Sequence, residues 1–501
     1  MKNRMIVAVA AAAAFLLPLK ASAQFAQNPP ETHDSTVVLT LEDALKIALS
    51  ENVSVKVADQ EIERVKYARK GTYASLFPQV NASGSYQRTI KKQVMYMGGG
   101  NDEEGGGGMA SMFEGLMDPV MYYIQQLMAH TGAVIPPYVP PVVERDTDSD
   151  GGIAVGRLNT YSAGLSASMP LVNFQLWESL RLSGDQVEMA VEQARNSRLG
   201  TVTSVKQAFY AVLMAKEAFN VYKSVYENAV ENFSRTEKRY RVQKASELDY
   251  TRAKTNVANA IPNVYNAESS VILALWQLKA VMGIDLDTPI DVEGALEDYA
   301  SHMFYDINEA REAGLERNTT MRQLSIQAEQ LAKTVRLQQY AYIPTLALNF
   351  SYSMNAMTND FKFSEYKWTP YSFVGVSLSI PIFSGGKRYF DVKQAKVQAS
   401  ELDLQRINTE RQLKIAIRQS LQTMETAMRT HIAAEDALGS AEKAYSIAAR
   451  SYDVGRSTLT DLDNAQLALT QAQLSASQAI YNYLVAKAGL ESTIGADYTA
   501  E

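Results

Sequence analysis

The sequence predicts a mixed fold in which a membrane β-barrel continues into an α-helical barrel. Four segments of about ten residues alternate apolar and polar side chains, as β-strands do. Two long stretches rich in Ala, Gln, Glu, Lys and Leu have the spacing of coiled-coil helices. The order of these segments occurs twice along the chain, which indicates a duplicated unit that joins strands to long helices.

Residues 1–23 have the order of a secretory signal peptide. Lys2 and Arg4 precede the apolar run 5–19, and the small residues 21–23 follow it. We therefore expect the mature chain to leave the cytoplasm and to begin with an N-terminal linker over 24–38.

Composition excludes several classes of partner. Without Lys2, Arg4 and Lys20 the 48 basic residues become 45 against 55 acidic ones, so the mature net charge is about −10. No block of basic residues suits nucleic acid. The absence of cysteine excludes a disulfide framework and a lipid anchor at the cleavage site. After the signal, no segment approaches the ~20 consecutive apolar residues that a spanning helix needs.

The predicted strands have one apolar face and one small, polar face. In the third, Leu346, Leu348 and Phe350 share a face, whereas Asn349 and Ser351 share the other. Lipid outside and water inside would produce this pattern, and a half-buried sheet of a soluble protein would produce it equally well. The strands are predicted over residues 80–90, 158–169, 345–354 and 371–380.

Four strands are too few to close a barrel in lipid. The smallest membrane barrels have about eight strands, and an open edge would leave backbone groups unpaired. Several chains would have to pool their strands, eight from two copies or twelve from three.

The helical segments are predicted to form hairpins over residues 175–282 and 386–490. Apolar residues such as Val205, Phe209 and Val212 follow the alternating four- and three-residue steps of a coiled coil. A helix of about 65 residues would be about 100 Å long. Stripes of this kind are typical of helix packing rather than of a cofactor site, so no cofactor is predicted.

The duplication divides the chain into a first repeat over 39–283 and a second over 306–495. Residues 41–45 with Asn52 reappear as 307–311 with Asn318, and Gly283 matches Gly495. Residues 284–305 are expected to be an equatorial linker, and 496–501 a C-terminal tail.

The repeat order and its motifs resemble the TolC family of outer-membrane efflux proteins. The resemblance covers residues 39–495 and is carried by Phe77-Pro78, by residues 381–386, and by residues 452–455 leading to Asp461. It implies a homotrimer with a twelve-stranded barrel in outer-membrane lipid and a coiled-coil tunnel across the periplasm. Implied partners are a periplasmic adaptor (membrane fusion) protein and an inner-membrane transporter that drives small molecules or proteins through a passive duct.

By the family pattern, Asp461 and Asn464 lie at the periplasmic entrance. They are three positions apart and so share a helical face, and threefold symmetry would turn Asp461 into a ring that attracts cations. The family often has Asp at both positions, so Asn464 implies a weaker ring. Thr458 and Asp461 also have the spacing of a helix cap, and capping alone is the alternative.

Other site residues follow from the same resemblance. Asp249 and Tyr452 correspond to residues that latch neighbouring hairpins in a closed state, although the expected Arg is replaced by Ser457. The first hairpin has Gln243 where the family tends to have Gly, so its turn departs from the family pattern at the place where the adaptor docks. The residues expected to contact the adaptor at the hairpin tips are Gln243, Lys244, Gly455 and Arg456.

The outer loop over residues 91–156 is very long, whereas the corresponding loops of the family are usually short. Its glycine-rich and proline-rich segments favour a mobile surface loop, and a plug, a lid or a contact with another surface protein is the alternative. The glycines lack the following Gly-Lys-Ser/Thr of a phosphate-binding loop.

The residue inventory does not favour an enzyme. His33, His130, His302 and His431 are isolated, with no metal-ligand spacing, and no nucleophile motif is present. A structural coiled-coil adhesin or envelope spacer is the alternative, but it would not need amphipathic strands between paired helices. Drug efflux and protein secretion are not separable from the sequence.

Overall fold

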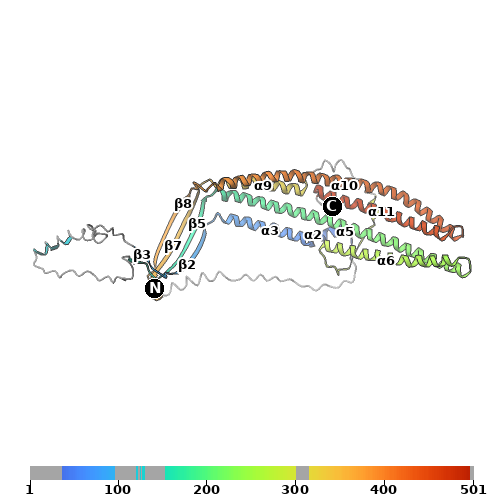
Figure 1. Cartoon of the computed structure of the whole chain (residues 1–501), viewed down its shortest axis with the longest axis horizontal. Helices are drawn as coiled ribbons and strands as arrows, with labels where there is room; N and C mark the ends of the chain where they lie inside the picture. The colour runs from blue at the N-terminus through green and yellow to red at the C-terminus, as the bar shows by residue number, and fades with distance from the viewer. Residues whose placement is uncertain are drawn as a thin grey trace.

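The computed structural model describes residues 37–95, 120–121, 124–125, 127–129, 153–300 and 315–496. The predicted signal peptide, residues 24–36 of the predicted linker, most of the 91–156 insertion and residues 497–501 lie outside the described chain. The molecule is elongated, with a β-sheet toward one end and helices running away from it (Figure 1).

The sheet has four antiparallel strands in the order β2-β5-β7-β8. They are β2 (Gln79–Arg88), β5 (Asn159–Val172), β7 (Thr345–Thr358) and β8 (Thr369–Ser379). Two strands run past their predicted ends. β5 continues through Pro170, where the register shifts, and β7 continues from 354 to Thr358.

The register gathers the apolar side chains on one face of the sheet. Val80, Ala167, Phe350 and Val374 are cross-strand neighbours in one row, while the adjacent row contains Gln79, Ser168, Asn349 and Gly375. The apolar row is not covered by other elements of the chain, since Val80 is 67% and Val374 71% exposed. β2 and β8 each pair with a single strand in the described chain, so each has an open edge.

Each strand of the sheet is continued by a helix. α3 (Val53–Ala74) leads into β2, α5 (Phe174–Arg241) follows β5, α9 (Thr319–Tyr340) leads into β7, and α10 (Lys387–Asp453) follows β8. The helices pack in the same order as the strands, α3-α5-α9-α10. α5 has 68 residues, which corresponds to about 100 Å.

Two returning helices complete the hairpins and meet the others at mid-length. α6 (Glu247–Met282) packs on α5, and α11 (Leu459–Ile494) packs on α10 and on α5. The main core lies where these helices converge and includes the fully buried Phe209, Leu278 and Leu490. No described helix combines the length and apolar character needed to cross a membrane.

The expected linkers contain secondary structure. β1 (Val37–Leu39), at the end of the predicted 24–38 linker, pairs in parallel with β6 (Ile290–Val292) in the predicted 284–305 linker. That second linker also contains α7 (Leu296–Ala300). The linker predictions are wrong at these positions because three-residue strands carry too little alternation to be recognised. In the insertion, β3 (Gln93–Met95) pairs with β4 (Ile153–Val155).

The repeated asparagines join the two halves of each repeat. After α2 (Leu41–Glu51), Asn52 accepts hydrogen bonds from the N–H groups that open α3 and donates its amide to the Val281 carbonyl over 2.7 Å. Asn318 caps α9 in the same way and donates to the Thr493 carbonyl over 2.6 Å. One side chain thus starts one helix and satisfies a carbonyl at the end of another.

The repeated glycines allow this close approach. Gly283 (φ +78°) and Gly495 (φ +71°) end α6 and α11 in the left-handed conformation. A Cβ on Gly283 would lie 2.8 Å from the Glu51 carbonyl oxygen, and a Cβ on Gly495 would collide with the Arg317 carbonyl. A side chain at either place would therefore meet both an unfavourable φ and rigid backbone.

We predict that Gly495→Ala destabilises the helical body by about 2 kcal/mol or more, because the new Cβ would push the 317–318 backbone away from α11. Gly439→Ala is the matched control, since Gly439 lies inside α10 with no atom near the added Cβ. It should stabilise the protein by about 0.5–1 kcal/mol. Thermal loss of the helical circular-dichroism signal measures both changes, and equal midpoints for the two variants would contradict the prediction.

Candidate functional site

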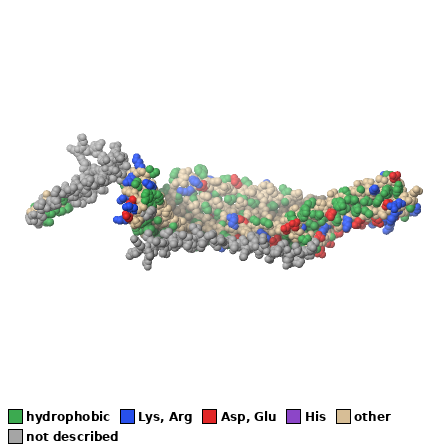
Figure 2. Space-filling view, turned by 90° about the horizontal axis from the view of Figure 1, so that it is seen from below, with side chains coloured by type: hydrophobic (Ala, Val, Ile, Leu, Met, Phe, Trp, Pro, Cys, Tyr) green, Lys and Arg blue, Asp and Glu red, His purple; other side chains and the backbone are tan. Residues whose placement is uncertain are grey.

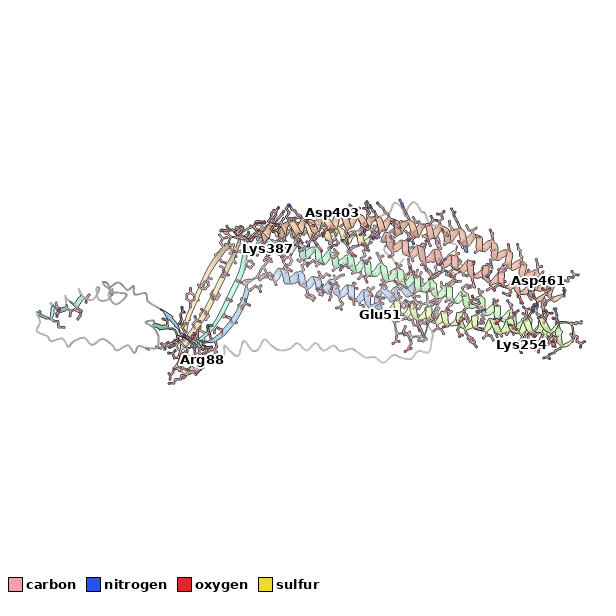
Figure 3. The ribbon with its side chains drawn as sticks, in the orientation of Figure 1. Glu51, Arg88, Lys254, Lys387, Asp403 and Asp461 are labelled. Carbon is pink, nitrogen blue, oxygen red and sulfur yellow. The ribbon has the colours of Figure 1, made fainter. Side chains whose placement is uncertain are left out.

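The ends of the two helical hairpins lie farthest from the sheet (Figure 3). These hairpin tips are the α5–α6 turn, residues 242–246, and the α10–α11 turn, residues 454–458. The predicted docking residues Gln243, Lys244, Gly455 and Arg456 all lie in these turns and are exposed. Their position makes them available to another protein.

The two tips have the same backbone geometry although only one has glycine. Gln243 (φ +57°) and Gly455 (φ +74°) are both left-handed. In each turn the next amide bonds back to the helix: Lys244 to the Arg239 carbonyl and Arg456 to the Ser451 carbonyl, both over 2.8 Å. The first tip therefore keeps the expected turn, at the steric cost of a side chain in the left-handed region.

Asp249 and Asp461 occupy equivalent places in the first turns of α6 and α11. The Ser246 hydroxyl accepts from the Asp249 amide and donates to its carboxylate, over 3.0 and 2.7 Å. Thr458 and Asp461 form a complete capping box, in which the carboxylate also accepts from the Thr458 amide over 2.9 Å. Helix capping is therefore one role of both residues.

Capping leaves the Asp461 charge accessible. Asp461 and Asn464 are both exposed. The hydrogen bonds from the Thr458 hydroxyl and amide hold the pKa of the Asp461 carboxyl below its usual range. The residue is thus an exposed anion at the hairpin tip over a wide pH range.

Tyr452 connects the two hairpins within one chain. Its ring is buried with Ala253, Leu459 and Leu462, and its hydroxyl bonds to the Thr236 hydroxyl on α5 over 2.8 Å. No hydrogen bond joins Tyr452 to Asp249 in the described chain, so these two predicted latch residues are not paired directly. Tyr452 instead fixes α10 against α5.

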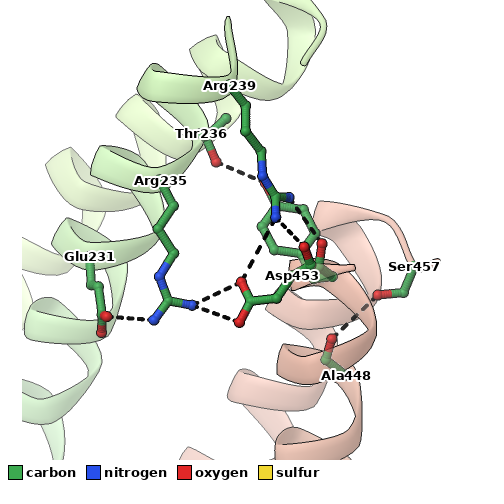
Figure 4. Close-up of polar contacts among 8 residues, drawn as sticks. Glu231, Arg235, Thr236, Arg239, Ala448, Asp453 and Ser457 are labelled. Carbon is green, nitrogen blue, oxygen red and sulfur yellow. Dashed lines mark hydrogen bonds and ion pairs between the residues drawn. The ribbon is translucent and has the colours of Figure 1, made fainter. Parts of the chain in front are cut away.

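Two arginines of α5 extend this contact (Figure 4). Arg239 donates to the Tyr452 carbonyl over 3.0 Å and lies over the Tyr452 ring at 5.1 Å. Arg235 bonds to both carboxylate oxygens of Asp453, over 3.0 and 3.1 Å, and also pairs with Glu231. Since Arg235 and Asp453 are partly exposed, their pair contributes less to stability than the buried Tyr452 contact.

An amide-rich cavity of about 320 Å³ lies between α5, α6 and α11 just above the tips. In its lining, Asn256 donates to Asp463 over 2.8 Å. Burial raises the pKa of the Asp463 carboxyl despite that bond and the charge of Arg252. The amides that line the cavity are Asn228, Asn232, Asn256, Asn259, Asn263 and Gln466. The cavity offers hydrogen-bond donors and acceptors with little fixed charge.

The sequence-based interpretation missed Arg235, Arg239 and Asp463. A signal for the arginines was available, because they are four positions apart and so share a helical face shortly after Phe233 of the apolar stripe. Asp463 had no such signal, since its burial depends on how α11 meets α6. Among the described residues, no group of three or more His, Asp or Glu side chains is arranged to hold a metal ion.

Comparisons with known proteins agree with this architecture. A family model described as "Outer membrane efflux protein" matches residues 143–284 and 311–496. The outer membrane protein TolC of Escherichia coli is 22% identical over 67% of this chain and 70% of its own length. The alkaline protease secretion protein AprF of Pseudomonas aeruginosa is 23% identical over the same shares of the two chains.

A solved structure shares the fold over nearly the whole chain. The CmeC outer membrane channel of Campylobacter jejuni aligns with a TM-score of 0.64 and 18% sequence identity. The alignment covers 91% of this chain and 85% of that protein. At this identity the likeness concerns the arrangement of strands and helices.

We predict that Gln243→Gly stabilises the first hairpin by about 1 kcal/mol, because glycine enters the left-handed region without a Cβ penalty. Hydrogen exchange of the turn amides, followed by mass spectrometry, should become slower near residues 240–250. Gln243→Ala is the control, since it keeps the Cβ and should show no gain. Equal exchange in the glycine and alanine variants would contradict the prediction.

Proposed function

The chain belongs to the outer membrane efflux protein family, and from that premise we propose how its parts work together as an exit duct. It is an outer-membrane channel that extends into the periplasm, with a fold of membrane strands and a helical tunnel. The observation that carries the proposal is the four-stranded sheet with an uncovered apolar face, which continues strand by strand into helices of about 100 Å. Lipid covers such a face, and the helices reach far below the membrane.

The protein is proposed to act as a homotrimer. The open edges of β2 and β8 need partners in lipid, where an unpaired backbone group costs several kcal/mol. Three copies pair these edges in a ring and give twelve strands, with the small, polar rows of each sheet lining the lumen. The helices that continue the strands then close the tunnel wall.

The hairpin tips are proposed to dock a periplasmic adaptor protein and, through it, an inner-membrane transporter that supplies energy. Gln243, Lys244, Gly455 and Arg456 present an exposed, positively charged turn pair to that partner. The amide-rich cavity lies next to the tips and suits the polar side chains of an added helix. This arrangement leaves the duct itself passive.

The entrance is proposed to select by charge at Asp461, with Asn464 as a neutral polar neighbour. Both side chains are exposed on one face of α11. The capping role of Asp461 is compatible with charge selection. The cap involves a single oxygen of the carboxylate, Oδ2, and the side chain keeps its negative charge. The competing hypothesis is that Asp461 only caps the helix, and it predicts that neutralising Asp461 leaves the ion preference unchanged.

The closed state is proposed to be held within each chain by Tyr452 and the arginines of α5, with Asp249 acting as the cap of α6. Widening the entrance by moving the second hairpin away from the first would break the Tyr452–Thr236 bond and separate Arg235 from Asp453. Ser457, at the position where the family has Arg, bonds to the Ala448 carbonyl of its own hairpin. The latch therefore uses α5 arginines in place of that residue.

We propose that the chain has no catalytic role and binds no cofactor. The proposal is supported by the names of similar proteins, among them an outer membrane protein, an outer membrane efflux protein and a protease secretion protein, none of which names an enzymatic reaction of its own. Small molecules and secreted proteins are both candidate cargo, since an efflux protein (BepC, 21% identical) and a protease secretion protein (AprF, 23% identical) are similar to this chain to nearly the same extent. An envelope spacer is the competing function, and it would form no conducting pore.

Single-channel recording in planar bilayers tests the duct and its entrance together. Wild-type protein should give discrete openings with a preference for cations. Asp461→Asn should reduce that preference severalfold, because it removes the exposed charge and keeps the side-chain volume. Thr458→Ala, which removes the cap and keeps the carboxylate, is the matched control and should retain the preference.

The lowered pKa of Asp461 adds a pH criterion. A carboxyl with a lowered pKa stays ionised as the pH falls through the usual Asp range. The cation preference should therefore persist at about pH 4, where an ordinary Asp would be about half protonated. If Thr458→Ala lost the cation preference and Asp461→Asn retained it, the result would show that Asp461 acts as a helix cap and not as a selectivity charge. The absence of openings in every variant would favour the envelope spacer.

Tyr452→Phe should make the channel open more often. Losing the hydroxyl removes a buried hydrogen bond worth about 1 kcal/mol from the closed state, which corresponds to about a fivefold shift toward open. Tyr240→Phe is the control, because Tyr240 stacks on Tyr250 within the first hairpin. Among the described residues, no hydrogen bond joins its hydroxyl to the second hairpin. The same increase in both variants would show that Tyr452 is not the latch.

A further inference from the structure

The end of the sheet opposite the helices brings three chain segments together. The register aligns Arg88 with Asn159 and Asn159 with Thr358, so the strand ends lie side by side. The segments at these ends are residues 88–92, 155–158 and 359–368, which are called the outer rim below. Figure 2 shows blue basic side chains gathered at this end of the sheet.

The outer rim has far more cations than carboxylates. Its two carboxylates are Asp360 and Glu365, and none of its cations forms an ion pair with a carboxylate of the described residues. Asp360 accepts from the Thr358 hydroxyl over 2.6 Å and from the Lys362 amide over 3.4 Å, so it is engaged in its own turn. The cations of the outer rim are Arg88, Lys91, Lys92, Arg157, Lys362 and Lys367.

Hydrogen bonds hold these segments in one surface. The Thr89 amide donates to the Leu158 carbonyl over 2.8 Å, and the Leu158 amide donates to the Asn359 side chain over 3.0 Å. Asn159, which is buried, donates to the Asp360 carbonyl over 3.1 Å. The cations therefore project from a common, ordered platform instead of from independent loops.

Assembly does not neutralise the outer rim. Any further copy that pairs with β2 or β8 brings the same six cations and two carboxylates to the same end of the sheet. The positive charge thus grows with the number of copies. The negative charges that balance it must therefore come either from another molecule or from residues of this chain outside the described part.

Aromatic side chains next to the cations place the outer rim at a membrane surface. Tyr86 stacks on Tyr161 at 4.9 Å, and Tyr161 lies against Tyr366 at 5.3 Å. Phe361 is exposed and carries the Arg88 guanidinium over its ring at 5.5 Å. Tyrosine and exposed aromatic rings at the end of an apolar face are typical of the headgroup level of a bilayer.

We propose that the outer rim binds the phosphate groups of the anionic glycolipid of the outer leaflet, lipopolysaccharide. The helices extend into the periplasm, so the opposite end of the sheet meets the outer leaflet. Unpaired Arg and Lys side chains form strong charge-assisted hydrogen bonds to phosphate oxygens. The proposal rests on the outer-membrane location and orientation of the chain, and it is independent of what passes through the duct.

The acidic insertion of the same chain is the competing source of counter-charge. Residues 96–152 contain nine Asp and Glu against a single Arg145. If these carboxylates occupied the outer rim, the full-length protein would have little affinity for external phosphate. Lipid binding by the complete chain therefore discriminates between the two.

The test uses full-length protein in detergent, titrated with purified lipopolysaccharide at about 0.15 M salt. A rim variant carries Arg88→Gln, Lys91→Gln, Arg157→Gln and Lys362→Gln. The control variant carries Lys387→Gln, Arg388→Gln, Lys393→Gln and Lys396→Gln at the other end of the sheet, where Lys387 lies (Figure 3). The rim variant should bind at least about tenfold more weakly than wild type, and the control within about twofold of it.

Two further probes identify the group that is recognised. Lipopolysaccharide whose lipid A phosphates have been removed should bind wild type as weakly as the intact lipid binds the rim variant. Vesicles of phosphatidylglycerol should bind less than intact lipopolysaccharide. Equal binding of the dephosphorylated lipid, equal binding of phosphatidylglycerol, or no binding by wild type would each overturn the proposal, the last in favour of the 96–152 carboxylates.

Channel recordings keep this proposal separate from the transport function. Openings of normal conductance in a protein that does not bind lipopolysaccharide would overturn the lipid site alone. Specific binding by a protein that gives no openings would leave the lipid site standing and count against the duct.

Discussion

A sheet with an uncovered apolar face and two open edges is the constraint on which the rest of this molecule depends. Water does not stabilise a row such as Val80, Ala167, Phe350 and Val374, and lipid does not tolerate the unpaired edges of β2 and β8. Lipid on the face and strands from other copies at the edges satisfy both requirements at once. Membrane insertion and assembly are therefore coupled by the same four strands.

The helices pack in the same order as the strands because each helix continues one strand of the sheet. Neighbouring strands lie about 4.8 Å apart, whereas packed helices are about 8–10 Å apart, so four helices need more width than four upright strands. Strands that tilt occupy more of the circumference, and Figure 1 shows the four strands inclined to the helices. At mid-length, Asn52 and Asn318 then fix where the returning helices end, and Gly283 and Gly495 let the chains approach closely.

Features that repeat along the chain could be predicted from sequence, whereas features that depend on packing could not. Alternation identified the strands, and the apolar steps around Val205 and Phe209 identified helices that are indeed buried there. The matches of Asn52 with Asn318 and Gly283 with Gly495 were visible, but their physical reason appears only where distant backbone carbonyls meet them. β1 and β6 escaped notice because their pairing joins residues far apart in the sequence.

At the hairpin tips, too, local sequence patterns could be predicted, whereas contacts between helices could not. The spacing of Thr458 and Asp461 predicted a cap, which the structure contains, while the partners of Tyr452 depended on how α10 lies against α5. The basic residues of the outer rim are visible in the sequence, but its first and last segments are more than 250 positions apart. Only the strand register shows that they form one surface. Three-dimensional proximity thus supplied what periodicity lacked.

Cross-linking between the open edges tests the central claim most directly. The chain contains no cysteine, so one cysteine on β2 at Ser83 and one on β8 at Ser377, both on the small, polar face of the sheet, would be the only thiols present. In outer membranes, a short maleimide cross-linker should join three copies into a single covalent species only when both cysteines are present. A protein that stays monomeric, or that is joined into dimers or long ladders without a preferred size, would contradict the account of a closed trimeric duct.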